Sequence, residues 1–163
     1  MLLLLFLKKK SECKKGQIFF LVVDIIGRID DLSKGANEMK KEQLQAFCLS
    51  LKGVTHDYQP EWQADRYHIG GKMFAMMGGD ANRKPVITLK CDPQRAEELR
   101  EAHEGIIPGY YMNKTHWNSI YLDADIPSSF VEELIEHSYQ LVFQKLTKKS
   151  QHDILLNDSK GND

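Results

Sequence analysis

The most informative part of this sequence is the stretch PGYYMNKTHWN, residues 108–118. It places two tyrosines, a lysine, a histidine, a tryptophan and two asparagines between a turn and an apparent strand. Aromatic faces can stack, Lys114 carries a charge, and asparagine amides both donate and accept hydrogen bonds. This chemistry is typical of a binding surface. The alternative is that Tyr110, Met112 and Trp117 anchor the loop to the core, because large aromatic side chains are commonly buried.

Length and composition limit the class of protein. The chain has 163 residues, 42% of them hydrophobic and 28% charged, with a formal net charge of −1. This length predicts one domain with a proper core, and the composition excludes both a basic nucleic-acid coat and an acidic disordered chain. Any attraction to phosphate must therefore be local. The cysteines, Cys13, Cys48 and Cys91, are widely spaced, which argues against a disulfide framework or structural zinc site and favours the cytoplasm.

The N-terminal part carries two apolar runs, residues 2–7 and 18–26. The first is followed rather than preceded by lysines, and both are too short to cross a bilayer, so we expect neither a signal peptide nor a membrane partner. Residues 33–38 have the composition of a linker. We therefore predict an extension over residues 1–38, a domain over 39–156 and a disordered tail over 157–163.

Periodicity places the secondary structure of the domain. Apolar residues spaced as on one helical face predict a helix that ends at Gly53, and short strands are predicted at 54–58, 66–69, 72–77, 86–90 and 117–122. Adjacent glycines at 70 and 71 predict a tight hairpin turn, since glycine accepts positive φ.

Two more helices complete the pattern. Asp92 and Pro93 predict the start of one, which Gly105 ends, and Ser129 and Glu132 have the spacing of a capping box at the start of the last long helix. The order of elements predicts an α+β fold, an antiparallel sheet with helices packed on one face.

Charge is segregated along the chain. Residues 66–90 hold five basic residues and one acid, a local excess of four, while the two later helices are rich in glutamate. If the helices cover one side of the sheet, the other side and its loops form a basic, partly aromatic surface with Lys72, Lys90, Lys114, His116 and Trp117. Such clusters attract phosphate, and aromatic faces stack bases. The alternative is that these charges are ordinary solvated side chains.

Four motifs together resemble one family: GGKMFA at 70–75, LKCDP at 89–93, the stretch at 108–118, and EHSYQLV at 136–142. Through these motifs, the chain resembles the MmcQ/YjbR family from about residue 39 to residue 146. The resemblance implies a CyaY-like, frataxin-related fold, also described as double-wing, and a DNA-binding role. The family's motif residues fall on Lys72, Lys90, Asn113, Lys114, His116 and Trp117. Many members have histidine where this chain has Tyr111.

We therefore predict a DNA-binding protein with no cofactor and no catalytic residues. The predicted nucleic-acid-binding residues are Lys72, Arg83, Lys84, Lys90, Asn113, Lys114, His116, Trp117 and Asn118. The alternatives are frataxin-like metal handling, with Glu97, Glu101 and Glu104 on one helical face, or a regulatory module that binds a small molecule or protein.

No catalytic motif such as HExxH or GxSxG is present, so we do not expect an enzyme. Cys91 could have a lowered pKa just ahead of a helix, although a structural role is expected for it. The sequence predicts no oligomeric state.

Overall fold

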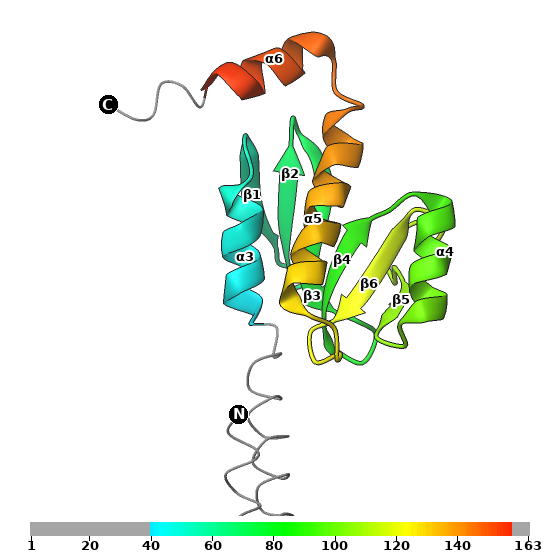
Figure 1. Cartoon of the computed structure of the whole chain (residues 1–163). Coiled ribbons are helices and arrows are strands. Elements are labelled where there is room, and N and C mark those ends of the chain that lie inside the picture. The colour runs from blue at the N-terminus through cyan, green and yellow to red at the C-terminus, as the bar shows by residue number, and fades with distance from the viewer. Residues whose placement is uncertain (1–39, 158–163) are drawn as a thin grey trace, which may run out of the picture. The chain divides into compact units, whose positions relative to one another are not determined.

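The fold is described from a computed structural model, which describes residues 40–157 (Figure 1). These residues belong to the unit Asn37–Asp163. The predicted extension 1–38 lies outside the described part, as does the predicted tail 157–163 except for Asn157, which is the last residue of a helix rather than part of a disordered tail. In chain order the elements are α3 (Lys41–Ser50), β1 (Val54–Gln59), β2 (Ala64–Ile69), β3 (Lys72–Gly79), β4 (Pro85–Lys90), α4 (Pro93–Ala102), β5 (Ile106–Pro108), β6 (Trp117–Tyr121), α5 (Ser128–Phe143) and α6 (Lys148–Asn157).

The strands form one six-stranded sheet in the order β1-β2-β3-β4-β6-β5, and every neighbouring pair is antiparallel. Helices α3, α5 and α4 lie against the same side of this sheet, with α5 over β3 and β4, α3 beside β1 and α4 beside β5 (Figure 1). The predicted α+β class and antiparallel sheet are confirmed.

Several local predictions are confirmed as well. Gly70 and Gly71 have φ values of 55° and 74°, which close the hairpin between β2 and β3. The Asp92 side chain caps α4 by accepting a hydrogen bond from the Gln94 N–H at 3.2 Å.

Two local predictions are wrong. The strand β5 was not predicted, because it has only three residues and ends in Pro108, so it carries no readable alternation. The capping box is also wrong. Pro127 stands at the N-cap of α5, and no side chain there bonds the free N–H groups. The position of α5 is set instead by the apolar stripe that it buries against the sheet.

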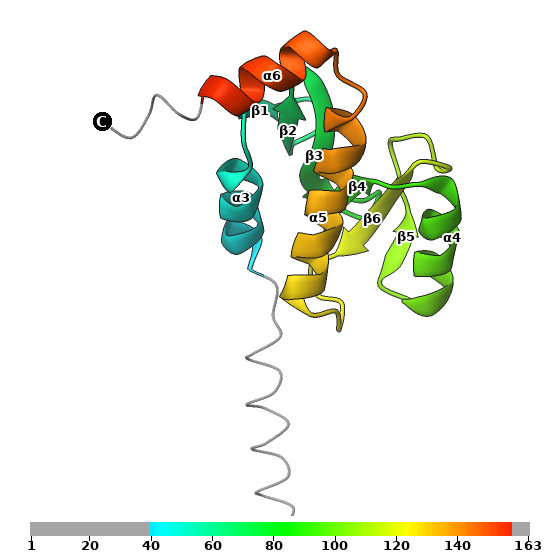
Figure 2. The same cartoon turned by 45° about the horizontal axis from the view of Figure 1, so that its top comes forward.

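The core lies between the sheet and the helices. Tyr67 and Phe74 are its largest fully buried side chains, and the Tyr139 ring from α5 meets the Phe74 ring edge-on at 5.6 Å. Beyond α5 the chain turns back across the sheet end, where α6 lies over β1 and β2 (Figure 2). The Leu146 side chain, just after α5, fills the space beside Gly70. This contact fixes the C-terminal end of α5 against the β2–β3 turn.

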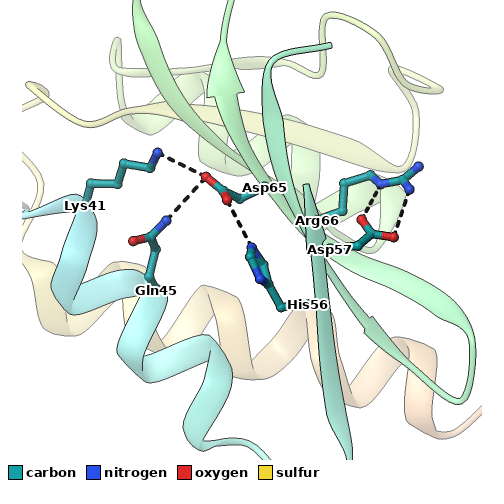
Figure 3. A network of polar contacts seen from close by, with 6 residues as sticks. All are labelled: Lys41, Gln45, His56, Asp57, Asp65 and Arg66. Atoms are coloured by element: carbon teal, nitrogen blue, oxygen red, sulfur yellow. Dashed lines mark hydrogen bonds and ion pairs between the residues drawn. The ribbon is translucent and has the colours of Figure 1, made fainter. Parts of the chain in front are cut away.

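A polar network fixes α3 to the edge of the sheet (Figure 3). The Asp65 carboxylate accepts from Lys41 at 3.0 Å, from Gln45 at 3.3 Å and from His56 at 3.0 Å. Burial acts to raise the pKa of Asp65, but the hydrogen bonds and charges of Lys41 and His56 outweigh it and leave the pKa below its usual value. The ionised form of Asp65 is therefore the one that stabilises the fold.

We predict that Asp65→Asn lowers the free energy of unfolding at neutral pH by about 1 kcal/mol, the upper range for such ion pairs. A carboxyl whose pKa is lower in the folded chain adds stability above its unfolded pKa, and this is lost as the pH falls through the folded value. The difference between wild type and variant should therefore shrink in acid, as urea denaturation at several pH values would measure. The control is Asp123→Asn, since that carboxylate is mostly exposed and pairs with Lys84, which is itself exposed. An Asp65→Asn effect that persists unchanged at low pH would contradict the prediction.

Candidate functional site

The four sequence motifs meet at one end of the sheet. Strand β3 begins there with Lys72, β4 ends there with Lys90, and β6 begins there with Trp117, which pairs directly with Lys90. The connection out of β4 is tied to the β5–β6 loop, because the Cys91 N–H donates to the His116 carbonyl at 2.8 Å.

A hydroxyl from the fourth motif joins these strands to α5. Ser138, which is fully buried, donates to the Phe74 carbonyl at 2.5 Å and accepts from the Lys90 N–H at 2.8 Å. Phe74 is the extra residue of a β-bulge, since its neighbours Met73 and Ala75 pair with consecutive residues of β2. The β3–β4 pairing stops at Ala75 and Leu89, one residue short of Phe74 and Lys90, and Ser138 satisfies the carbonyl of the one and the N–H of the other.

Three lysines gather above this framework. The Lys90 ammonium lies 5.6 Å from the centroid of the Trp117 ring. Burial lowers the pKa of Lys90, and the nearby positive charges of Lys145 and Lys72 lower it further. We call Lys72, Lys90 and Lys145 the lysine cluster. Sequence reasoning missed Lys145; the available signal was its place seven residues after Ser138, two turns along from the same motif.

The remaining predicted residues of the stretch 108–118 divide into exposed and internal side chains. Lys114 and His116 are exposed, and the Lys114 carbonyl is held by Arg100 at 3.2 Å. The Asn113 carboxamide accepts from the Thr115 N–H at 2.9 Å and so shapes the turn. Trp117 is only 9% exposed.

Asn118 points the other way, toward the helices. Its amide donates to the Ala96 carbonyl at 3.1 Å and accepts from Arg100 at 2.8 Å, and the residue is 3% exposed. These bonds hold α4 against β6. The side chain of Asn118 is therefore used inside the fold.

Arg83 and Lys84 lie at the opposite end of β4 from Lys90, a strand of six residues or about 20 Å away. Lys84 pairs with Asp123 at 3.1 Å and covers the Tyr121 ring at 4.1 Å. Arg66 is likewise paired with Asp57. The structure thus brings Lys72, Lys90 and Trp117 together and separates them from Arg83 and Lys84.

A small cavity between the sheet, α4 and α5 contains Cys91 and His137. Burial raises the pKa of the Cys91 thiol, so the lowered pKa considered from its place ahead of a helix is wrong. The His137 Nε2 atom is buried without a hydrogen-bond partner among the described residues, and burial lowers its pKa. The cavity, about 10 Å³, is about large enough for one water molecule.

Within residues 40–157, no group of three or more histidine, cysteine or acidic side chains is arranged to hold a metal ion. Glu97, Glu101 and Glu104 form no such group. In the same range, no helix combines the length and the apolar character needed to cross a bilayer.

The fold and this site define a class: a six-stranded antiparallel sheet with helices on one side and a lysine-rich end built from four motifs. The YjbR family model matches residues 49–141, and the chain belongs to this family. The uncharacterised protein YjbR of Escherichia coli strain K12 is 33% identical over 102 residues, which are 63% of this chain and 86% of the relative. The uncharacterised protein YbdF of Escherichia coli O157:H7 is 38% identical over 94 residues, 58% of this chain and 75% of the relative.

A solved structure agrees with the fold. The crystal structure of a Deinococcus radiodurans protein with a DUF419 domain superimposes with a TM-score of 0.65 at 32% identity. The match covers 73% of this chain and 90% of that one.

We predict that Ser138→Ala destabilises the protein strongly. It leaves the Phe74 carbonyl and the Lys90 N–H without their partner, and each unsatisfied group costs about 1–3 kcal/mol, so a loss of about 2–6 kcal/mol is expected. Chemical denaturation would measure it. The matched control is Ser129→Ala on the same helix, which is exposed and makes no capping bond. Equal small losses in both variants would show that Ser138 does not have this role.

Proposed function

We propose that this protein binds nucleic acid through contacts between the lysine cluster and phosphate groups. The observation that carries the proposal is the setting of Lys90. Its ammonium is partly buried, the charged groups that act on it are two further lysines, and its pKa is lowered as a result. Such a cluster is unfavourable alone, and a phosphate anion relieves the repulsion.

The surroundings favour a polyanion over a single small anion. Lys114 stands exposed on the loop next to Trp117, so positive charge continues beyond the cluster, and the exposed His116 side chain lies on the same loop. The chain as a whole carries a formal charge of −1, and the glutamates of α4 and α5 lie on the helical layer. Attraction is therefore strongest at the lysine-rich end of the sheet, which would orient a bound strand or duplex.

The role we propose is binding without turnover, in the cytoplasm. The CyaY-like, double-wing architecture stays a prediction from the sequence resemblance, as does the DNA-binding role of the family. Support for the proposal comes from the lysine cluster itself.

The test is the salt dependence of binding to a fluorescently labelled DNA duplex, followed by anisotropy. We expect affinity to fall as salt rises, with a log–log slope of about −0.9 for each phosphate contacted. The double variant Lys90→Gln/Lys145→Gln should bind more weakly, and the magnitude of its salt slope should be smaller by about 2, one for each lysine removed. Because the fold disfavours the charge on Lys90, the Lys90→Gln change should not reduce stability, which separates loss of binding from unfolding.

Lys84→Gln is the matched control, since it makes the same change in charge at the far end of β4, where Asp123 already neutralises the lysine. Its slope should stay near that of the wild type. Absence of any binding at low salt would overturn the proposal, and so would equal losses in the control and the double variant.

A further inference from the structure

We propose a second site, a hollow that takes one unstacked nucleobase together with its phosphate from a single-stranded nucleic acid. This inference rests on the proposed function and deepens it. The hollow has a volume of about 230 Å³ and is lined by the β1–β2 turn, the β3–β4 turn and one loop residue. The lining residues are Glu61, Trp62, Gln63, Gly79, Asp80, Arg83 and Tyr111.

Two large aromatic side chains stand open at this hollow. Trp62 is 42% exposed and Tyr111 is 55% exposed. Neighbours steady both rings: the Arg66 guanidinium lies 5.6 Å from the centroid of the Trp62 ring, and the Tyr110 ring meets the Tyr111 ring edge-on at 4.6 Å. Two bonds of 2.7 and 2.9 Å to Asp57 fix Arg66 in turn (Figure 3). Rings held open in this way are platforms for a planar ligand.

The backbone of the hollow is strained. Among residues 40–157, Gln63 and Arg83 are the two non-glycine residues with positive φ, 49° and 61°, and both line it. Such residues concentrate at ligand sites, because a fold keeps them only where the surroundings enforce them.

Asp80 enforces the turn that carries Arg83. Its carboxylate accepts from the N–H groups of Asn82 at 2.8 Å and Lys84 at 2.9 Å, and from the Tyr121 hydroxyl at 3.0 Å. Both carboxylate oxygens are thus occupied within the fold. The acid builds the hollow and leaves Arg83 as its free cation, since the Arg83 side chain has no hydrogen bond or ion pair with the described part of the chain.

These groups match a nucleotide better than an aromatic peptide side chain. A base would stack on Trp62 and Tyr111, its edge would reach Glu61 and Gln63, and its phosphate would meet Arg83. An aromatic side chain would use the rings and leave the charged and amide groups without partners. The base must be unstacked, because in a duplex its faces are covered. This requirement selects a single strand.

The path of the Tyr111 loop connects this hollow to the lysine cluster. The loop runs from Pro108 to Trp117, beside Lys90, whereas the hollow lies at the other end of β4, where Gly79 pairs with Pro85. Tyr111 lines the hollow only if its loop folds back along the face of the sheet away from the helices. A strand that follows this loop would reach both sites.

The chain offers a direct reporter for each site, because its two tryptophans are Trp62 at the hollow and Trp117 at the lysine cluster. In the full-length Trp117→Phe variant, we expect a short single-stranded DNA oligonucleotide to quench the fluorescence of Trp62. Adding Tyr111→Ala should weaken this binding about 5- to 150-fold, the range for loss of one base stack. Arg83→Gln should lower the magnitude of the salt slope by about one.

Tyr58→Ala is the matched control, since Tyr58 is equally exposed but does not line the hollow. It should leave binding unchanged. Duplex binding that depends on the lysine cluster, without quenching of Trp62 by the oligonucleotide, would overturn this inference and leave the proposed function standing. Quenching of Trp62 with the same oligonucleotide affinity in the Tyr111→Ala variant would also overturn it. A free nucleoside 5′-monophosphate that binds as tightly as the oligonucleotide would overturn the assignment to a strand.

Discussion

The hydrogen bonds of the buried Ser138 hydroxyl hold together the end of the sheet that carries the lysine cluster. It satisfies the Phe74 carbonyl of β3 and the N–H of Lys90, the last residue of β4, where the pairing of these strands ends, so one side chain of α5 fixes the position of both strands. Lys90 extends from the residue whose N–H is bound, and Trp117 pairs with that residue across the sheet. The geometry of the lysine cluster is therefore a consequence of a hydrogen bond in the core. A core that binds backbone groups in this way can hold like charges close together, because the strands cannot move apart to relieve them.

Charge in this protein is balanced by contacts between distant segments. Residues 66–90 carry an excess of four positive charges, but Asp57 from β1 binds Arg66, and Asp123 after β6 binds Lys84. Counting along the sequence overstates the basic surface for this reason. The basic residues of this segment that have no acidic partner within residues 40–157 are divided between the two ends of the sheet, with Lys72 and Lys90 at one and Arg83 at the other.

The sequence was sufficient for the fold class and for most elements, because apolar periodicity and turn residues such as Gly70, Gly71 and Asp92 act locally. Strand β5 escaped because three residues carry no period, and its pairing is decided by β6. In the candidate site, Lys72, Lys90 and Trp117 were predicted and lie together. Lys145 and Trp62 were missed because sheet topology and helix packing bring them to their sites. The internal role of Asn118 follows from strand alternation, which places it on the face opposite Trp117, yet only the packing of α4 shows which face is inside.

The two ends of the sheet differ in how they are held, and the difference bears on function. The lysine end is built from buried hydrogen bonds, so it presents fixed charge. The aromatic end is built from turns with strained backbone. There the Asp80 carbonyl accepts from the Arg83 N–H at 2.9 Å, and the Arg83 backbone leaves no room for a side chain at Gly79. A ligand that uses both a cationic contact and a ring platform is a polyanion with aromatic groups. A single-stranded nucleic acid has both properties, and the loop that carries Lys114 and Tyr111 connects the two ends along one path.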